Sequence, residues 1–195
     1  MNLINTIVID DYITLGILDL EAFAQSSGLN VKREIEKKGT LYLLQNLLKG
    51  KVFNLCYTEQ NKPYLKDSDT HLSISHSHSR LAIILNTRQS TGVDIELLRD
   101  KIQNVKHKYL SAQELSFAGN DAVLLTVLWA AKEAIYKAYG LKEIDFASHM
   151  FIEPFGPKDD LFFGHLKKND IAKKYLLKRE QHENYILVYI LNEVQ

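Results

Sequence analysis

The sequence contains a single cysteine, Cys56, among its 195 residues. One cysteine excludes a disulfide within the chain, which indicates a reducing compartment such as the cytosol. The charges also cancel, because 24 lysines and arginines are balanced by 24 aspartates and glutamates. A neutral chain has no overall field to attract nucleic acid or a membrane surface, so any electrostatic steering must come from local patches.

Long hydrophobic runs are missing as well. No stretch approaches the roughly 18 apolar residues of a membrane-spanning helix. The first residues, MNLINTIVIDDY, contain no basic segment, and their apolar run is too short for a secretory signal peptide. No internal repeat is visible. The chain is 46% hydrophobic and 25% charged, and it is long enough for one large or two small domains. These bounds predict a globular cytoplasmic enzyme or binding protein.

The segment from Asn120 to Gly140, NDAVLLTVLWAAKEAIYKAYG, has the periodicity of an amphipathic helix. Asn120 or Asp121 is suited to cap its start, and Gly140 to end it. Glu133 lies on the side opposite the apolar stripe, and Lys137 follows one turn later. We therefore expect a core face opposite a face with one carboxylate and one ammonium. The stripe consists of Leu124, Leu128, Ala131, Ile135 and Ala138.

A second stretch, Thr91-Gly-Val-Asp-Ile-Glu96, alternates like a β-strand. Asp94 and Glu96 would share a strand face without core contacts, roughly 6.5–7 Å apart at the backbone. With a third carboxylate from a helix they would complete an oxygen site for Mg²⁺. Taken alone, Glu133 and Lys137 would be interpreted as a solvated ion pair worth about 0.3–0.5 kcal/mol, and the carboxylates of the second stretch favour the metal site instead.

The other elements follow from local patterns. A helix containing Leu41, Leu44, Leu47 and Leu48 should end at Gly50. The segment Tyr12–Gln25 is compatible with a helix or with a strand and turn. A hairpin is expected around residues 182–184. The predicted strands are Asn5–Ile9, Val52–Thr58, Met150–Pro154, Leu161–Leu166, Tyr175–Glu180 and Tyr185–Leu191.

The blocks Gly-Val-Asp-Ile-Glu, ending at Glu96, and Trp-Ala-Ala-Lys-Glu-Ala-Ile-Tyr-Lys, ending at Lys137, occur in this order and at a characteristic separation. Together they resemble the signature of the 4'-phosphopantetheinyl transferase superfamily, in its longer, monomeric Sfp-like type. The resemblance implies an α+β fold of two similar halves that form a pseudo-dimer, each a small antiparallel sheet packed against helices. Residues 1–91 would be the N-terminal half, and residues 92–195 the half with the metal-binding carboxylates.

The resemblance also implies a reaction. Phosphopantetheine would pass from coenzyme A to a serine of an acyl or peptidyl carrier protein, releasing adenosine 3',5'-bisphosphate, in fatty acid, polyketide or nonribosomal peptide synthesis. Asp94, Glu96 and Glu133 would hold Mg²⁺. Glu133 would also help to deprotonate the serine, and Lys137 would neutralise the leaving bisphosphate, so the catalytic residues would be Asp94, Glu133 and Lys137.

A coenzyme A site is implied too. Asn61-Lys62-Pro63 stands where the family usually has Gly-Lys-Pro, and Asn61 can adopt the same left-handed conformation. Ile74-Ser-His-Ser77 resembles a third family block, in which a serine and a histidine in a tight turn suit phosphate oxygens. The arginine that often meets the 3'-phosphate is absent, which leaves Arg33 or Lys38 for that contact. The candidate coenzyme A ligands are Arg33, Lys38, Lys62, Pro63, Ser75, His76, Asp94, Lys132 and Lys137.

Several alternatives stay open. Ser111 and Glu114 match a family element, which would give Glu114 a catalytic role, but they also form a Ser-x-x-Glu capping box. His76 and His78 are spaced for zinc, although no cysteine or third nearby histidine completes a tetrahedral site. A coenzyme A or carrier-protein binding module without chemistry, or an Mg²⁺-dependent phosphohydrolase, would use the same residues.

A basic run near the C-terminus is the last feature. It would steer the small acidic carrier proteins that this family modifies, or simply keep a sheet edge solvated. Its members are Lys167, Lys168, Lys173, Lys174, Lys178 and Arg179.

Overall fold

The computed structural model of the chain describes residues 3–194. Residues 1 and 2 of the predicted N-terminal half and residue 195 of the predicted C-terminal half lie outside the described residues. The fold is mixed α+β with antiparallel sheets. The chain divides into two compact units, Met1–Ser90 and Thr91–Gln195. Among residues 3–194, no helix has the length and hydropathy needed to cross a membrane.

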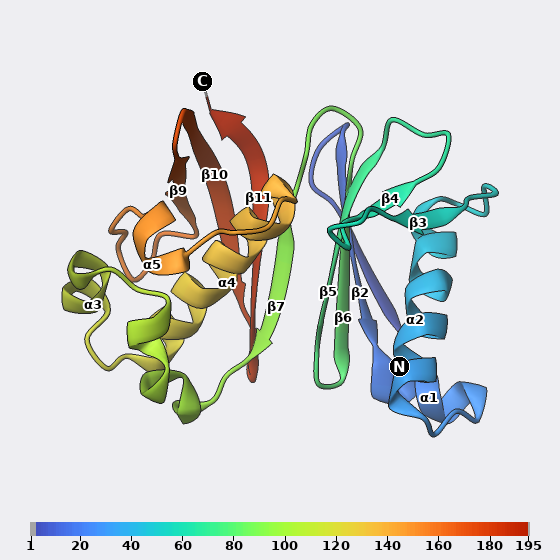
Figure 1. Ribbon diagram of the computed structural model, residues 1–195. Helices are drawn as coiled ribbons and strands as arrows, with labels where there is room; N and C mark the ends of the chain where they lie inside the picture. Colours follow the sequence, from blue (N-terminus) through green and yellow to red (C-terminus); the bar gives the residue numbers. More distant parts are fainter. Residues whose placement is uncertain (1–2, 195) are drawn as a thin grey trace. The chain divides into compact units, whose positions relative to one another are not determined.

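The N-terminal unit is an antiparallel sheet in the order β1-β2-β6-β5, with α2 packed against β2 and β6 (Figure 1). The strand predicted near residue 5 is confirmed as β1. The segment Tyr12–Gln25, left open by the sequence, contains β2 and then α1, whose start is capped by Asp19 through Glu21 N and Ala22 N. The elements are β1 Ile4–Val8, β2 Ile13–Asp19, α1 Leu20–Ser27, α2 Lys32–Leu47, β3 Leu55–Tyr57, β4 Pro63–Leu65, β5 His71–Ser77 and β6 Arg80–Asn86.

The C-terminal unit is an antiparallel sheet in the order β7-β11-β10-β9-β8, crossed by α4 (Figure 1). The predicted hairpin around residues 182–184 is confirmed, since β10 and β11 pair across this turn. The elements are β7 Val93–Leu97, the 3₁₀ helices η1 Asp100–Asn104 and η2 Lys106–Lys108, α3 Ala112–Ala118, α4 Ala122–Tyr139, α5 Phe146–His149, β8 Met150–Ile152, β9 Leu161–Lys168, β10 Ile171–Gln181 and β11 Tyr185–Val194.

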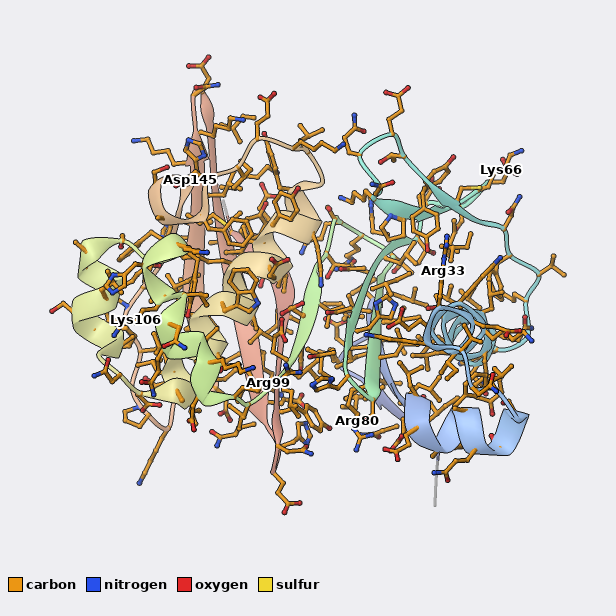
Figure 2. The ribbon with its side chains drawn as sticks, turned by 60° about the horizontal axis from the view of Figure 1, so that its bottom comes forward. Arg33, Lys66, Arg80, Arg99, Lys106 and Asp145 are labelled. Carbon is orange, nitrogen blue, oxygen red and sulfur yellow. The ribbon has the colours of Figure 1, made fainter. Side chains whose placement is uncertain are left out.

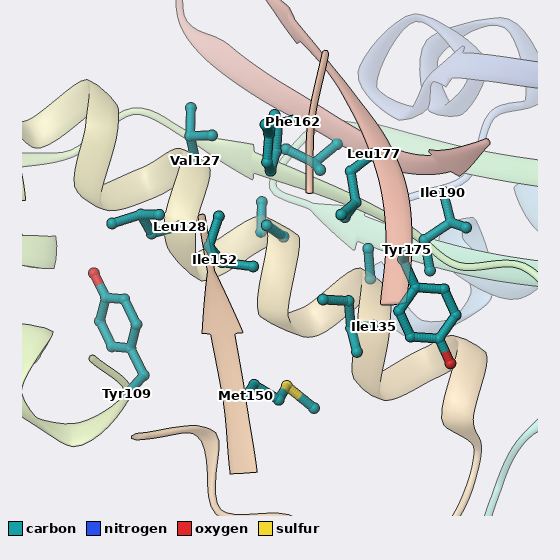
Figure 3. Close-up of a cluster of buried hydrophobic side chains, with 14 of the residues drawn as sticks. Tyr109, Val127, Leu128, Ile135, Met150, Ile152, Phe162, Tyr175, Leu177 and Ile190 are labelled. Atoms are coloured by element: carbon teal, nitrogen blue, oxygen red, sulfur yellow. The ribbon is translucent and has the colours of Figure 1, made fainter. Parts of the chain in front are cut away.

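Helix α4 is the centre of the C-terminal core. Its predicted ends are confirmed, because the Asp121 carboxylate accepts hydrogen bonds from Val123 N and Leu124 N, and Gly140 closes the helix at φ 73°. Leu128 and Ile135 are fully buried and pack toward the sheet strands (Figure 3). The predicted face with Glu133 and Lys137 is present and both side chains are half-buried, but this face is narrow. Residues are buried around most of the helix, including Lys132, because α5, β8 and the segment before α3 pack on its other side.

Strand β7 turns its carboxylates toward α4. Asp94 pairs with Val188 and Glu96 with Ile186, and both partners belong to the core beneath the helix. Directly paired residues of an antiparallel ladder point to the same face. The expectation that the two carboxylates occupy a face without core contacts is therefore wrong, and Asp94 is only 3% exposed.

Gly92 permits this close packing. A Cβ atom at this position would lie 1.9 Å from the backbone oxygen of Ala134 in α4, a distance no side chain can occupy. The glycine of the Gly-Val-Asp-Ile-Glu block therefore brings the carboxylate strand within side-chain reach of the helix.

Candidate functional site

The first candidate site lies within the C-terminal unit, between β7 and α4, and we call it the carboxylate site. Trp129, Glu133 and Lys137 follow each other at i, i+4 and i+8 on α4, so they form one stripe. Lys137 Nζ lies 2.7 Å from Asp94 Oδ1 and also donates to Val93 O at 3.1 Å. Trp129 Nε1 donates to Glu96 Oε1 at 2.9 Å. The two carboxylates of β7 are thus bound by the two ends of the stripe, and Glu133 lies between those ends.

The pKa of the Glu133 carboxyl group is changed by burial and by the charged side chains around it. Burial, followed by the negative charge of Asp94, raises the pKa of its carboxyl group to about 7. Glu96 raises the pKa further, whereas the Lys137 ammonium lowers it. The three predicted carboxylates are therefore close enough to repel one another, and one ammonium does not compensate them. Such a surplus of negative charge favours a cation.

The donor set of this site fits Mg²⁺ in its chemistry. Within residues 3–194, no group of three His, Cys, Asp or Glu side chains is already arranged as a metal cage. Mg²⁺ does not require one, because it is usually bound by one or two carboxylates together with waters and substrate phosphates. Asp94, Glu96 and Glu133 offer only oxygen ligands, which Mg²⁺ prefers. The assignment of the cation to these residues stays a prediction.

Lys132 requires a correction. The sequence placed it among the coenzyme A ligands, but its side chain is completely buried. Its Nζ atom lies 2.7 Å from Glu114 Oε2 and donates to the backbone oxygens of Tyr109, Phe146 and Met150 at 2.8–3.0 Å. Burial lowers the pKa of Lys132, which the bond to Glu114 opposes. All its bonding capacity is used inside the unit, so Lys132 is a structural cross-link.

Glu114 belongs to the same network. Its Oε2 accepts a hydrogen bond from Ser111 N, and its own N–H donates to Ser111 Oγ, which completes the capping box of α3. Its Oε1 accepts from Ile152 N. Between the catalytic and capping interpretations of Glu114, the structure supports the cap, with the buried ion pair to Lys132 as a second structural role.

The second candidate site lies within the N-terminal unit, and we call it the basic cavity. It has a volume of about 430 Å³. Arg33, labelled on α2 in Figure 2, lies one helical turn before Lys37, and both line the cavity with His76 of β5. Lys37 was not among the predicted ligands, yet its i+4 spacing from Arg33 could have identified it. The remaining lining residues are Glu36, Thr40, Leu41, Leu55 and Tyr57.

Other predicted ligands lie apart from this cavity. Lys38 forms a 2.7 Å ion pair with Glu34 on α2 and does not line it. Ser75 and His76 are consecutive residues of strand β5 rather than parts of a tight turn, so their side chains point to opposite faces. Ser75 is buried and His76 is exposed. Of the two, only His76 lines the basic cavity, and the joint contact of Ser75 and His76 with phosphate stays a prediction.

The Asn61-Lys62-Pro63 segment adopts the expected backbone. Asn61 has φ 65°, which confirms that asparagine takes the left-handed conformation here. Lys62 Nζ donates to Ser90 Oγ at 2.9 Å. Pro63 pairs with Tyr57 in the β3–β4 ribbon, and Tyr57 in turn lines the basic cavity.

The basic run near the C-terminus is largely paired. Lys173 lies 2.7 Å from Glu193, and Lys174 lies 3.0 Å from Glu153. The buried Arg179 binds the backbone oxygens of Pro157 and Asp159. Neighbouring residues of β10 also point to opposite faces of the sheet. The run therefore does not form one basic surface.

The segment that contains the carboxylate site matches the model of a known family. A model of the 4'-phosphopantetheinyl transferase superfamily matches residues 90–190, just over half of the chain and nearly all of the C-terminal unit. The chain belongs to the 4'-phosphopantetheinyl transferase superfamily. A comparison with curated proteins gave no match.

Proposed function

We propose that the protein transfers 4'-phosphopantetheine from coenzyme A to a serine of an acyl or peptidyl carrier protein. The observation that carries this proposal is the arrangement of Asp94, Glu133 and Glu96 between β7 and α4 in the segment that matches the superfamily. Membership supports phosphopantetheine transfer in general. The Sfp-like type, the pseudo-dimer of residues 1–91 and 92–195, and a monomeric state are part of the same proposal.

In this reaction the serine Oγ forms a bond to the phosphorus that carries pantetheine, and the bridging P–O bond breaks. Glu133 would accept the serine proton, and Lys137 would stabilise the negative charge of the departing adenosine 3',5'-bisphosphate. Asp94, Glu96 and Glu133 would hold Mg²⁺, whose chemistry when bound is to offset charge on the pyrophosphate.

We assign the nucleotide end of coenzyme A to the basic cavity. Arg33, Lys37 and His76 line it, and arginine and lysine are the common phosphate-binding side chains. For the contact with the 3'-phosphate we propose Lys37 instead of Lys38, because Lys37 lines the cavity and Lys38 does not. In isothermal titration calorimetry, Arg33→Ala and Lys37→Ala should weaken binding of coenzyme A more than binding of its 3'-dephospho form. Lys38→Ala, on the same helix, is the matched control and should leave both affinities unchanged.

The experiment that tests the whole proposal is mass spectrometry of candidate apo-carrier proteins after incubation with coenzyme A and Mg²⁺. We expect the carrier to gain the mass of phosphopantetheine, and we expect EDTA or Glu133→Gln to prevent the gain. A hydrolase would instead split coenzyme A without any carrier, and a binding module would bind coenzyme A and leave it intact. Either result would refute the transferase assignment.

A further inference from the structure

We propose that Trp129 is a positioning residue, which holds the Glu96 carboxylate in the orientation in which it binds the divalent cation. This inference rests on the proposed function, because it assumes a cation in the carboxylate site. Its basis is the 2.9 Å hydrogen bond from Trp129 Nε1 to Glu96 Oε1, which joins α4 to β7.

The indole itself is held firmly. Tyr109 packs edge-on against it, with ring centroids 5.1 Å apart and planes at 73°, and Phe146 packs at 5.7 Å. Tyr109 is 1% exposed, and its hydroxyl donates to the backbone oxygen of Leu125 on α4, the helix that also carries Trp129. The donor atom is therefore fixed by a packed core before Glu96 is bound.

The strength of the bond is sufficient to orient Glu96. Ordering a glutamate side chain costs free energy through lost rotamer freedom. A hydrogen bond to a charged group is among the stronger hydrogen bonds in proteins and offsets this cost. The indole can therefore select one orientation of a carboxylate that is otherwise only half-buried.

The chemical nature of the donor is informative. Asp94 is bound by the Lys137 ammonium, which neutralises part of its charge. The indole N–H that Glu96 accepts from Trp129 is neutral, so this bond orients the carboxylate without itself neutralising the carboxylate charge. Metal ligands are commonly oriented in this way by hydrogen bonds from outside the coordination shell. Trp129 and Glu96 also line the same cavity of about 270 Å³. The indole N–H therefore has open space beside it, and its hydrogen bond to Glu96 is not imposed by a closed core.

The test uses Mn²⁺ as the probe, with its binding measured by the electron paramagnetic resonance signal of the free ion. Trp129→Phe keeps an aromatic ring and removes the N–H donor, and we expect the Kd for Mn²⁺ to rise about 10- to 100-fold. Phe146→Leu is the matched control, because it loosens the indole packing without removing the donor; its Kd should stay within about threefold of the wild-type value. In a Glu96→Gln background, Trp129→Phe should have little further effect.

A second replacement guards against misfolding of Trp129→Phe. Trp129 is the only tryptophan of the chain, so biosynthetic replacement of tryptophan by benzothienylalanine changes this position alone. The analogue keeps the bicyclic shape and replaces the N–H with sulfur. We expect the same loss of Mn²⁺ affinity as in Trp129→Phe.

The outcomes separate this inference from the proposed function. Unchanged Mn²⁺ affinity in the benzothienylalanine protein, with weakened affinity in Glu96→Gln, would overturn the role of Trp129 and leave the cation site intact. A loss in Trp129→Phe that the analogue does not reproduce would assign the effect to packing, which also overturns the inference. Absence of Mn²⁺ binding to the wild-type protein would overturn this inference, whereas the mass-spectrometric test of carrier modification decides the proposed function.

Discussion

Two lysines on α4, Lys132 and Lys137, have different surroundings. Lys132 precedes Glu133 directly, yet it is buried and binds four oxygen atoms of its own unit. Lys137 reaches the carboxylate site and pairs with Asp94. At helical pitch the two side chains differ by about 140° in direction, so only one can face β7.

The role of Lys132 can be measured as stability. Lys132→Met removes the ammonium and leaves the Glu114 carboxylate buried without its counter-charge, so we expect a loss of about 3–5 kcal/mol in the free energy of unfolding. Lys132→Met combined with Glu114→Gln should recover part of this loss, because the buried charge is then gone. Chemical denaturation measures both effects. Unchanged stability with weakened coenzyme A binding would instead restore the ligand role that the sequence suggested.

At this scale the sequence predicted residue types better than their surroundings. The shared faces of the carboxylates and of Lys137, and the capping box, followed from spacing, whereas the roles given to the carboxylates and to Lys137 followed from the family resemblance. The burial of Lys132 did not, because it depends on α5, β8 and the segment before α3, which the helical period does not describe. The contribution of Trp129 was missed for a related reason, since an apolar-looking residue gave no sign that its N–H would meet Glu96.

At the scale of elements, the spacing between β7 and α4 determines the carboxylate site. Side chains of both elements meet only because Gly92 lets the strand approach the backbone of Ala134. The sequence predicted both elements and their capping residues. It did not predict that the carboxylate face of β7 also packs on the core, because alternation distinguishes two faces without saying how deeply each is buried.

Gly92→Ala tests this spacing. The added Cβ would meet a backbone oxygen, which cannot rotate away, so strand and helix must separate. We expect a loss of about 3 kcal/mol or more in the free energy of unfolding. Gly164→Ala is the control, because its Cβ would meet only terminal methyl groups of Ile135, Ile152 and Leu177, and its cost should be smaller. Thermal or chemical denaturation of the two variants compares them, and a smaller loss for Gly92→Ala would contradict the account.

At the scale of the whole molecule, the zero net charge means that attraction of an acidic partner depends on where unpaired positive charge lies. Lys173 and Lys174, the most suggestive basic residues in the sequence, each have an acidic partner. The exposed Arg99 and Lys101 form no ion pair with another described residue, and they line the 270 Å³ cavity that also contains Glu96 and Trp129. Sequence alone favoured the longer run, because the number of lysines is visible in a sequence and their pairing is not.

The steering of carrier proteins should follow this distribution. If the proposed transfer is correct, Arg99→Gln with Lys101→Gln should raise the KM for an acidic carrier about tenfold at low ionic strength, because the lost charges lie beside the carboxylate site. The difference from wild type should shrink at high salt, and the KM for coenzyme A should not change. Lys173→Gln with Lys174→Gln removes the same number of charges from a paired region and should leave the KM for the carrier within about twofold of the wild-type value. Steady-state kinetics at two salt concentrations distinguishes the variants. A larger effect from the Lys173 and Lys174 pair would show that their ion pairs open toward the partner and that the basic run is the docking surface after all.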